Sequence, residues 1–180
     1  MEIHTIGHST RPIEEFVQML KAHGIAQLVD IRTIPRSRRN PQFNRETLPA
    51  SLEAAGIEYS HLPGLGGLRR ARPDSTNTAW RNASFRGYAD YMQTEEFSEN
   101  LQKLIELGAG KPTAIMCAEA VPWRCHRSLV ADALLARGIR VTEISSETKT
   151  QPHSMTPFAL VEHERVSYPG NEPKNLKLKF

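Results

Sequence analysis

The chain has 180 residues, of which 39% are apolar and 24% are charged. This is ordinary globular usage, so a disordered or fibrous protein is excluded and one packed domain is expected. No apolar run approaches the roughly 20 residues that span a bilayer, and no signal-peptide pattern follows Met1, so we expect a cytoplasmic protein with no membrane partner. The net charge of +3 is compatible with binding phosphates or nucleic acid, but many proteins without such partners share it.

Strands and helices alternate along the first 145 residues. Short apolar runs predict strands at 2–6, 27–31, 57–62, 113–116 and 139–144. Helical spacing predicts helices at 12–24, 45–55 and 128–137, with one or two more between 84 and 107. A parallel crossover needs a dozen or more residues, so this order favours an α/β fold. We expect a single domain with a mainly parallel sheet of about five strands and helices on both faces.

Two segments are polar and irregular. Residues 68–82 suit a surface excursion that could cover a site. Residues 146–180 form a C-terminal extension, packed on or trailing from the domain at 1–145, with a possible short helix at 157–161.

Polar residues follow four of the predicted strands. They are His8 and Ser9, Asp30 and Arg32, His61 with the glycine-rich turn 63–67, and Cys117 with Glu119. The carboxyl ends of parallel strands share one edge of a sheet, where ligands of open α/β sheets bind. We therefore expect these residues to line one crevice.

The loop after Cys117 has the composition of an anion site. A helix begins about ten residues later, so its positive end and Arg124 or Arg127 would attract an oxyanion and lower the pKa of the thiol. The plainer alternative is that Cys117 is a small buried apolar residue and Arg127 an ordinary residue at a helix start.

The two cysteines, Cys117 and Cys125, could also take part in metal binding or redox chemistry. With His8, His61 and His126 they offer sulfur and imidazole ligands that zinc accepts. The cysteines are eight positions apart, however, whereas zinc knuckles use two to four. No metal or other cofactor is favoured, and zinc stays a minority possibility. A redox-active Cys117–Cys125 pair is a further alternative.

Four motifs resemble a known family. The run from Cys117 to Ser128 (CAEAVPWRCHRS), together with Gly7-His8-Ser9, Asp30-Ile31-Arg32 and Leu65-Gly66-Gly67, closely resembles the uncharacterised family called domain of unknown function 488. The resemblance extends from about Thr5 to Ile144. It implies no established reaction or substrate.

A more distant resemblance concerns chemistry. Leu28 to Arg32 looks like the aspartate–arginine strand of rhodanese-type sulfurtransferases, and Ile115 to Cys117 resembles their strand leading to a reactive cysteine. This resemblance implies a cysteine that carries a persulfide. In rhodaneses the cysteine and the arginine flank a compact anion-binding loop, whereas nine residues separate Cys117 from Arg127.

The leading hypothesis is an enzyme acting on a phosphorylated, nucleotide or nucleic-acid substrate. Cys117 would be a nucleophile or a close substrate contact, Glu119 a general acid or base, and His8 a proton carrier. The residues expected to bind the substrate are Ser9, Asp30, Arg32, Gly66, Gly67, Arg69, Cys125, His126 and Arg127.

Two alternatives stay open. One is a non-catalytic nucleic-acid-binding module, in which arginines contact phosphate and Trp80, Trp123 or Tyr88 stacks on bases. The other is a rhodanese-like sulfurtransferase. In each case the expected partner is an anionic small molecule or a nucleic acid.

Overall fold

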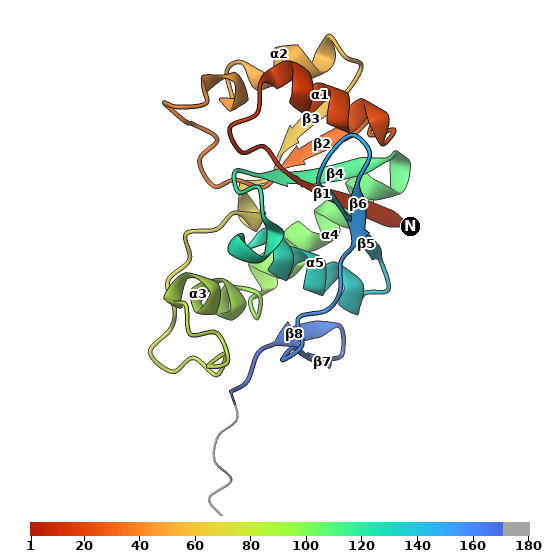
Figure 1. The fold of residues 1–180 in the computed structure, drawn as a ribbon. Helices are drawn as coiled ribbons and strands as arrows, with labels where there is room; N and C mark the ends of the chain where they lie inside the picture. Colours follow the sequence, from red (N-terminus) through yellow and green to blue (C-terminus); the bar gives the residue numbers. More distant parts are fainter. Residues whose placement is uncertain (171–180) are drawn as a thin grey trace, which may run out of the picture.

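The computed structural model describes residues 1–170, so positions 171–180 of the predicted extension lie outside the described residues. Its centre is one six-stranded sheet in the order β3-β2-β4-β1-β5-β6 (Figure 1). The strands are β1 (Glu2–Gly7), β2 (Gln27–Asp30), β3 (Glu58–His61), β4 (Thr113–Cys117), β5 (Arg140–Ile144) and β6 (Thr150–Pro152). The first five are parallel, and β6 pairs antiparallel with β5.

Helices cover both faces of the sheet, which confirms the expected fold class. In Figure 1, α1 (Ile13–Ala22) and α2 (Leu48–Glu53) lie above the sheet, while α4 (Glu95–Gly110) and α5 (Arg127–Ala136) lie below it. The helix α3 (Ala83–Tyr91) packs beside α4 and α5 in the lower layer. None of the helices in residues 1–170 has the length and apolar character of a membrane span.

Strand periodicity divides the core in two. Neighbouring residues of a strand point to opposite faces, so Leu28 packs with α1 and α2 whereas Val29 packs with α3, α4 and α5. Both side chains are fully buried. A strand covered on both faces is apolar at successive positions, and this is why β2 carries Leu28 and Val29 and β4 carries residues 114–117 in unbroken apolar runs.

Two predicted helices, at 45–55 and 157–161, differ from the structure, whereas the one or two helices expected at 84–107 are confirmed as two. The helix expected at 45–55 begins only at Leu48, because Pro49 has no N–H and its ring is tolerated only in the first turn. The segment 84–107 forms two helices, and Thr94 caps the second by accepting a hydrogen bond from the Phe97 N–H. The prediction of a short helix at 157–161 is wrong.

That segment enters a small hairpin instead, formed by β7 (Leu160–Glu162) and β8 (Arg165–Ser167). His163 and Glu164 join the two strands with φ angles of 50° and 65°. Two consecutive left-handed residues form the turn that matches the twist of a two-residue hairpin. The sheet also has six strands where about five were expected, because the C-terminal segment turns back after Ser145 and supplies β6.

The C-terminal segment is anchored on α5 through Asp132, which is fully buried. Its carboxylate accepts hydrogen bonds from the Tyr168 hydroxyl at 2.7 Å and the Thr156 N–H at 3.1 Å, and His153 Nε2 lies 2.8 Å from it. Burial, together with the Asp132 carboxylate, raises the pKa of Tyr168, so this hydroxyl stays protonated and donates. The segment from β6 to Tyr168 is thus part of the packed domain.

Replacing Tyr168 by Phe should lower the free energy of unfolding by about 1–3 kcal/mol, because a buried carboxylate loses a donor without gaining a new one. Urea unfolding followed by circular dichroism measures the change. The control Val161→Thr alters a 42% exposed side chain of the same hairpin and should change the stability by less than about 0.5 kcal/mol. Equal stability of Tyr168→Phe and the native chain would contradict the anchoring role.

Candidate functional site

A cleft runs along the carboxyl ends of the parallel strands, at the left of the sheet in Figure 1. It has two halves, with volumes of about 440 and 530 Å³. Five residues line both halves: Arg32, Ile34, Ala118, Glu119 and Arg124. We call these two halves together the carboxyl-edge cleft. The thiol half adds Cys117, Cys125, His126, Gly67 and Phe85, and the other half adds His8, Ser9 and Arg36.

Cys117 is the last residue of β4 and contributes to the floor of the cleft. Its side chain is 1% exposed, and Arg127 Nη1 donates a hydrogen bond of 2.7 Å to its Sγ atom. The same nitrogen donates to the Glu119 carbonyl oxygen, also at 2.7 Å. A buried guanidinium this close favours the thiolate form of the cysteine.

Arg127 is itself fully buried and is held by a carboxylate from β5. Its Nη2 atom forms an ion pair of 2.8 Å with Glu143, which also accepts a hydrogen bond from the Thr5 hydroxyl. Burial raises the pKa of the Glu143 carboxyl, and the neighbouring Arg127 opposes this shift. The arginine therefore links the thiol at the end of β4 to a carboxylate inside the sheet.

The two cysteines differ in protonation. Burial alone would raise the pKa of Cys117, but a hydrogen bond from the Cys125 side chain and the charge of Arg127 outweigh burial and lower it. The pKa of Cys125 is raised, first by this hydrogen bond to Cys117 and then by burial. The pair is best described as a Cys117 thiolate that accepts a hydrogen bond from a Cys125 thiol.

The backbone of the loop after Cys117 is oriented by its carbonyl groups. The carbonyl groups of residues 118–120 accept hydrogen bonds from the Ser9 N–H at 2.9 Å and from Arg127 at 2.7 and 3.3 Å. In a planar trans peptide the carbonyl and the following N–H point in opposite directions, and no cis peptide occurs in residues 1–170. The N–H groups of residues 119–121 therefore point away from Ser9 and Arg127, and these three residues line one half of the cleft. Successive N–H groups of this kind attract anions.

Gly7 makes this loop geometry possible. A Cβ atom at this position would lie 1.8 Å from the Glu119 carbonyl oxygen, so any larger residue would push the loop away from β1. The glycine of the Gly7-His8-Ser9 motif is explained by this close approach.

His8 and Arg32 form a second network, in which the arginine is saturated by protein groups. Arg32 donates through Nε and Nη2 to the fully buried Asp30, through Nη2 to the Phe43 carbonyl at 2.7 Å, and through Nη1 to His8 Nε2 at 3.2 Å. His8 Nδ1 lies 2.8 Å from the Ser9 carbonyl oxygen, which fixes the neutral tautomer with a proton on Nδ1. Burial lowers the pKa of His8 to about 4, and the Arg32 charge adds to this effect.

His126 lines the thiol half of the cleft and, like His8, is a buried neutral imidazole. Its Nε2 atom is 3.4 Å from the Ile31 carbonyl oxygen, and its Nδ1 atom is 3.6 Å from the Cys125 sulfur. Burial lowers its pKa to about 4. Gly67 leaves the room this ring needs, because a Cβ atom there would lie 3.0 Å from Nδ1.

The structure brings most of the predicted site residues to the cleft, but four of them do not line it. Asp30 is buried behind Arg32, and Arg127 is buried beneath Cys117. Gly66 packs on Thr33, and Arg69 stacks on the Tyr91 ring with its guanidinium carbon 3.7 Å from the ring centroid. The predicted residues that line the cleft are His8, Ser9, Arg32, Gly67, Cys117, Glu119, Cys125 and His126.

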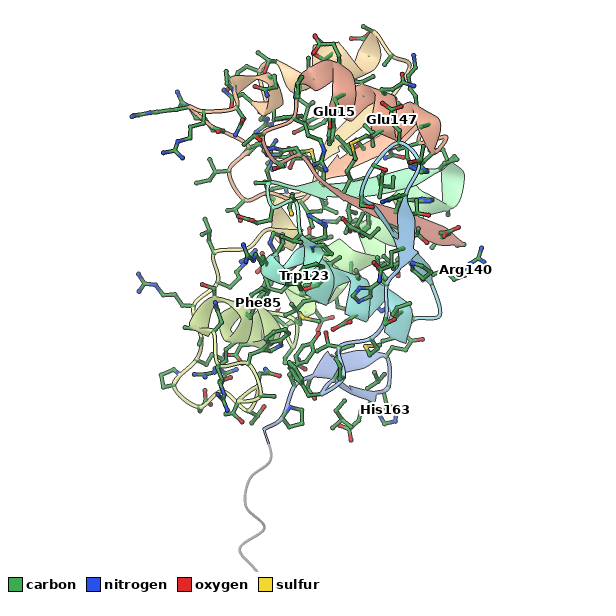
Figure 2. All side chains as sticks on the ribbon, in the orientation of Figure 1. Glu15, Phe85, Trp123, Arg140, Glu147 and His163 are labelled. Atoms are coloured by element: carbon green, nitrogen blue, oxygen red, sulfur yellow. The ribbon has the colours of Figure 1, made fainter. Side chains whose placement is uncertain are left out.

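The list of site residues predicted from the sequence lacked several that the fold brings to the site. Asn82, Ser84 and Phe85 reach the thiol half from the start of α3, while Arg124, expected from the sequence as an alternative to Arg127 at the anion site, lines both halves of the cleft. Figure 2 shows Phe85 on α3 and Trp123 on the loop that precedes α5. Glu143 was also missed, because β5 carries Arg140 and Thr142 as well and its sequence does not distinguish a buried carboxylate from an exposed one.

A metal site needs several histidine, cysteine or carboxylate side chains close together. Within residues 1–170, no group of three or more His, Cys, Asp or Glu side chains is placed to hold a metal ion. In this arrangement the ring nitrogens of His8 face Arg32 and the Ser9 carbonyl, and His61 Nε2 lies 2.8 Å from the Arg32 carbonyl oxygen.

The fold and the cleft define an α/β protein with a buried thiolate–arginine pair at the carboxyl edge of a parallel sheet. The family model for the domain of unknown function DUF488 matches residues 12–134, more than half of the chain, and the chain belongs to this family. No curated protein matches it significantly. A DUF442 protein from Shewanella putrefaciens CN-32, described as a candidate phosphatase, is similar in structure with a TM-score of 0.40 and 12% identity. The match covers 74% of this chain and 66% of that protein, just under two thirds of its length.

Acid should destabilise the fold through His8. The unfolded chain takes up this proton near pH 6.5 and the folded chain only near pH 4, so the stabilisation is complete above about pH 6.5 and is lost as the pH falls toward 4. The loss is roughly 3 kcal/mol, from about 2.5 pKa units at 1.36 kcal/mol each. Urea unfolding at about pH 7 and about pH 4.5 measures it.

His8→Asn should reduce this pH dependence, whereas His163→Asn, at an exposed left-handed turn position distant from the cleft, should keep it (Figure 2). An unchanged pH dependence in His8→Asn would contradict the assignment of a neutral buried imidazole.

Cys117 should react with iodoacetamide with a pH midpoint below the value of about 8.5 for a free thiol. Cys125→Ala removes the S–H donor and should raise the midpoint, while Cys125→Ser keeps a donor and should raise it less. Labelling rates against pH, with mass spectrometry to locate the label, provide the measurement. Identical midpoints in all three proteins would refute the thiolate–thiol pair.

Proposed function

We propose that the protein is a cysteine-dependent enzyme that acts on a phosphorylated, nucleotide or nucleic-acid substrate in the carboxyl-edge cleft. One observation carries the proposal: the Arg127 guanidinium holds the Cys117 sulfur and also the carbonyl groups of Glu119 and Ala120, so that the N–H groups of residues 120 and 121 point away from it. A nucleophile and an anion-binding surface are thereby built from the same loop.

The positive charge available to a substrate belongs to Arg124 and Arg36. Both line the half of the cleft that loop residues 119–121 also line. Arg127 and Arg32, by contrast, are occupied by Glu143 and Asp30. The anion is therefore bound by Arg124, Arg36 and the loop backbone, and the two buried arginines position the groups around it.

The proposed reaction begins with attack of the Cys117 thiolate on the electrophilic atom of the substrate, the phosphorus in a phosphate ester. The S–P bond forms as the P–O bond to the leaving group breaks, and Glu119 donates the proton that the leaving oxygen takes up. Glu119 is exposed and lines both halves of the cleft, so it can reach a leaving group in either half. Water then attacks the phosphorus as the S–P bond breaks, its proton passes to Glu119, and the sulfur leaves as the thiolate.

A second candidate, a non-catalytic nucleic-acid-binding module, is favoured by the aromatic residues behind the loop. Trp123 is 70% exposed, and with Trp80 it lines a cavity of about 350 Å³ next to the cleft. Such rings stack on bases, and the exposed arginines at 36, 38 and 39 would contact phosphates. Binding of a short single-stranded oligonucleotide that weakens steeply with salt and is unaffected by Cys117→Ala, without turnover, would favour the module.

Removal of the positive charge of either exposed cleft arginine should weaken anion binding. Arg124→Ala is expected to reduce the affinity for pyrophosphate by roughly tenfold, because one charge-assisted hydrogen bond is lost, and Arg36→Ala should have a similar effect. Isothermal titration calorimetry at low salt measures both. The matched control is Arg140→Ala, which removes an exposed charge on β5, distant from the cleft in Figure 2. Equal loss in the control and in Arg124→Ala would show that only net charge matters.

A further inference from the structure

The two cysteines share one environment although seven residues separate them. Both are free, both belong to the same buried cluster and both line the thiol half of the cleft. Arg127 contacts both sulfurs: its side chain donates to Cys117 at 2.7 Å, and its backbone N–H donates to Cys125 at 3.5 Å. Each sulfur atom therefore lies within hydrogen-bond distance of the same arginine residue.

We propose that Cys125 is the resolving thiol of Cys117, and that a hydroperoxide converts the pair into a Cys117–Cys125 disulfide in the floor of the cleft. This pairing does not depend on the reaction proposed above, because it needs only the two thiols and an oxidant.

The chemistry has two steps. The Cys117 thiolate attacks the hydroperoxide, the O–O bond breaks, and the sulfur is oxidised by two electrons to a sulfenic acid while an alkoxide leaves and takes a proton from water. Cys125 then attacks the sulfenic sulfur. The S–S bond forms, the S–O bond breaks, and the departing hydroxide leaves as water with the proton of Cys125.

The roles of the two thiols follow from their surroundings. The thiolate is the form that attacks an oxidant, and the guanidinium of Arg127 stabilises it at Cys117. The charge on Arg127 remains in place for the second step, because its other nitrogen is held by Glu143. Cys125 contacts the same arginine residue as Cys117, so a local movement of the loop brings it to the sulfenic sulfur.

The backbone between the cysteines allows the disulfide to close without unfolding the domain. Cys117 is the last residue of β4, and Cys125 lies two residues before α5. The regular structure between them is the short 3-10 turn Pro122–Arg124. The loop residues 118–120, which precede this turn, are exposed. Closure therefore moves a surface loop and leaves the sheet and α5 intact. It also masks the nucleophile, so oxidation should silence the site reversibly.

The test is oxidation of the full chain with one equivalent of hydrogen peroxide, followed by alkylation of free thiols and peptide mass mapping. The native protein should lose two hydrogen atoms and yield one cross-linked pair of peptides containing Cys117 and Cys125, reversed by dithiothreitol. Cys125→Ser should stop at a sulfenic acid on Cys117 that dimedone traps. Cys117→Ser should show no oxidation of Cys125 over the same time.

Three results would overturn the proposal: sulfinic acid on Cys117 of the native protein without a disulfide, disulfides only between separate chains, or equal dimedone labelling of the native protein and Cys125→Ser. Circular dichroism of each variant separates these outcomes from misfolding. Pyrophosphate binding by the reduced protein is measured in parallel, so that failure of the anion site and failure of the thiol pair are told apart.

Discussion

The buried guanidinium of Arg127 is the interaction on which the site depends. It joins the Cys117 sulfur, the carbonyl groups of Glu119 and Ala120, and the Glu143 carboxylate, and Arg127 itself is fully buried. A charge in such a place is stable only when it is paired and hydrogen-bonded, and breaking a buried pair costs about 3–5 kcal/mol. The same contacts that satisfy this charge favour the thiolate and orient the loop. Stability and reactivity are therefore determined by one side chain.

Asp30 and Arg32 obey the same constraint with a different result. Their ion pair of 2.7 Å is closed by His8, Phe43 and the Tyr59 hydroxyl, so Arg32 presents little unused hydrogen-bonding capacity to the cleft. The resemblance of this strand to an aspartate–arginine motif suggested a ligand contact. In the structure the pair instead fixes the wall that faces the thiol loop. The arginines available to bind an anion are those that the fold does not use in internal ion pairs.

One loop thus carries three features: the thiolate at its start, outward N–H groups in its middle, and a second thiol at its end. These features are coupled through Arg127, because any change at Cys117 alters the partner that this arginine holds. A substrate reaction and an oxidation at Cys117 would compete for the same sulfur. The short loop, which lacks long regular structure, is the part of the site that can adjust to either event.

The sequence alone determined the α/β class, the parallel strands and the collection of polar residues at their ends, because apolar periodicity and turn-forming residues act locally. It identified the thiol loop by composition. It did not determine which arginine would be buried and which would face a ligand: Arg124 and Arg127 are three positions apart, yet only Arg127 meets Glu143. It also missed β6 and the attachment of Tyr168 to Asp132, and it wrongly predicted a helix at 157–161. Pairings of this kind join residues from 16 to 138 positions apart, as in Arg127–Glu143 and Thr5–Glu143, and only the tertiary structure brings them together.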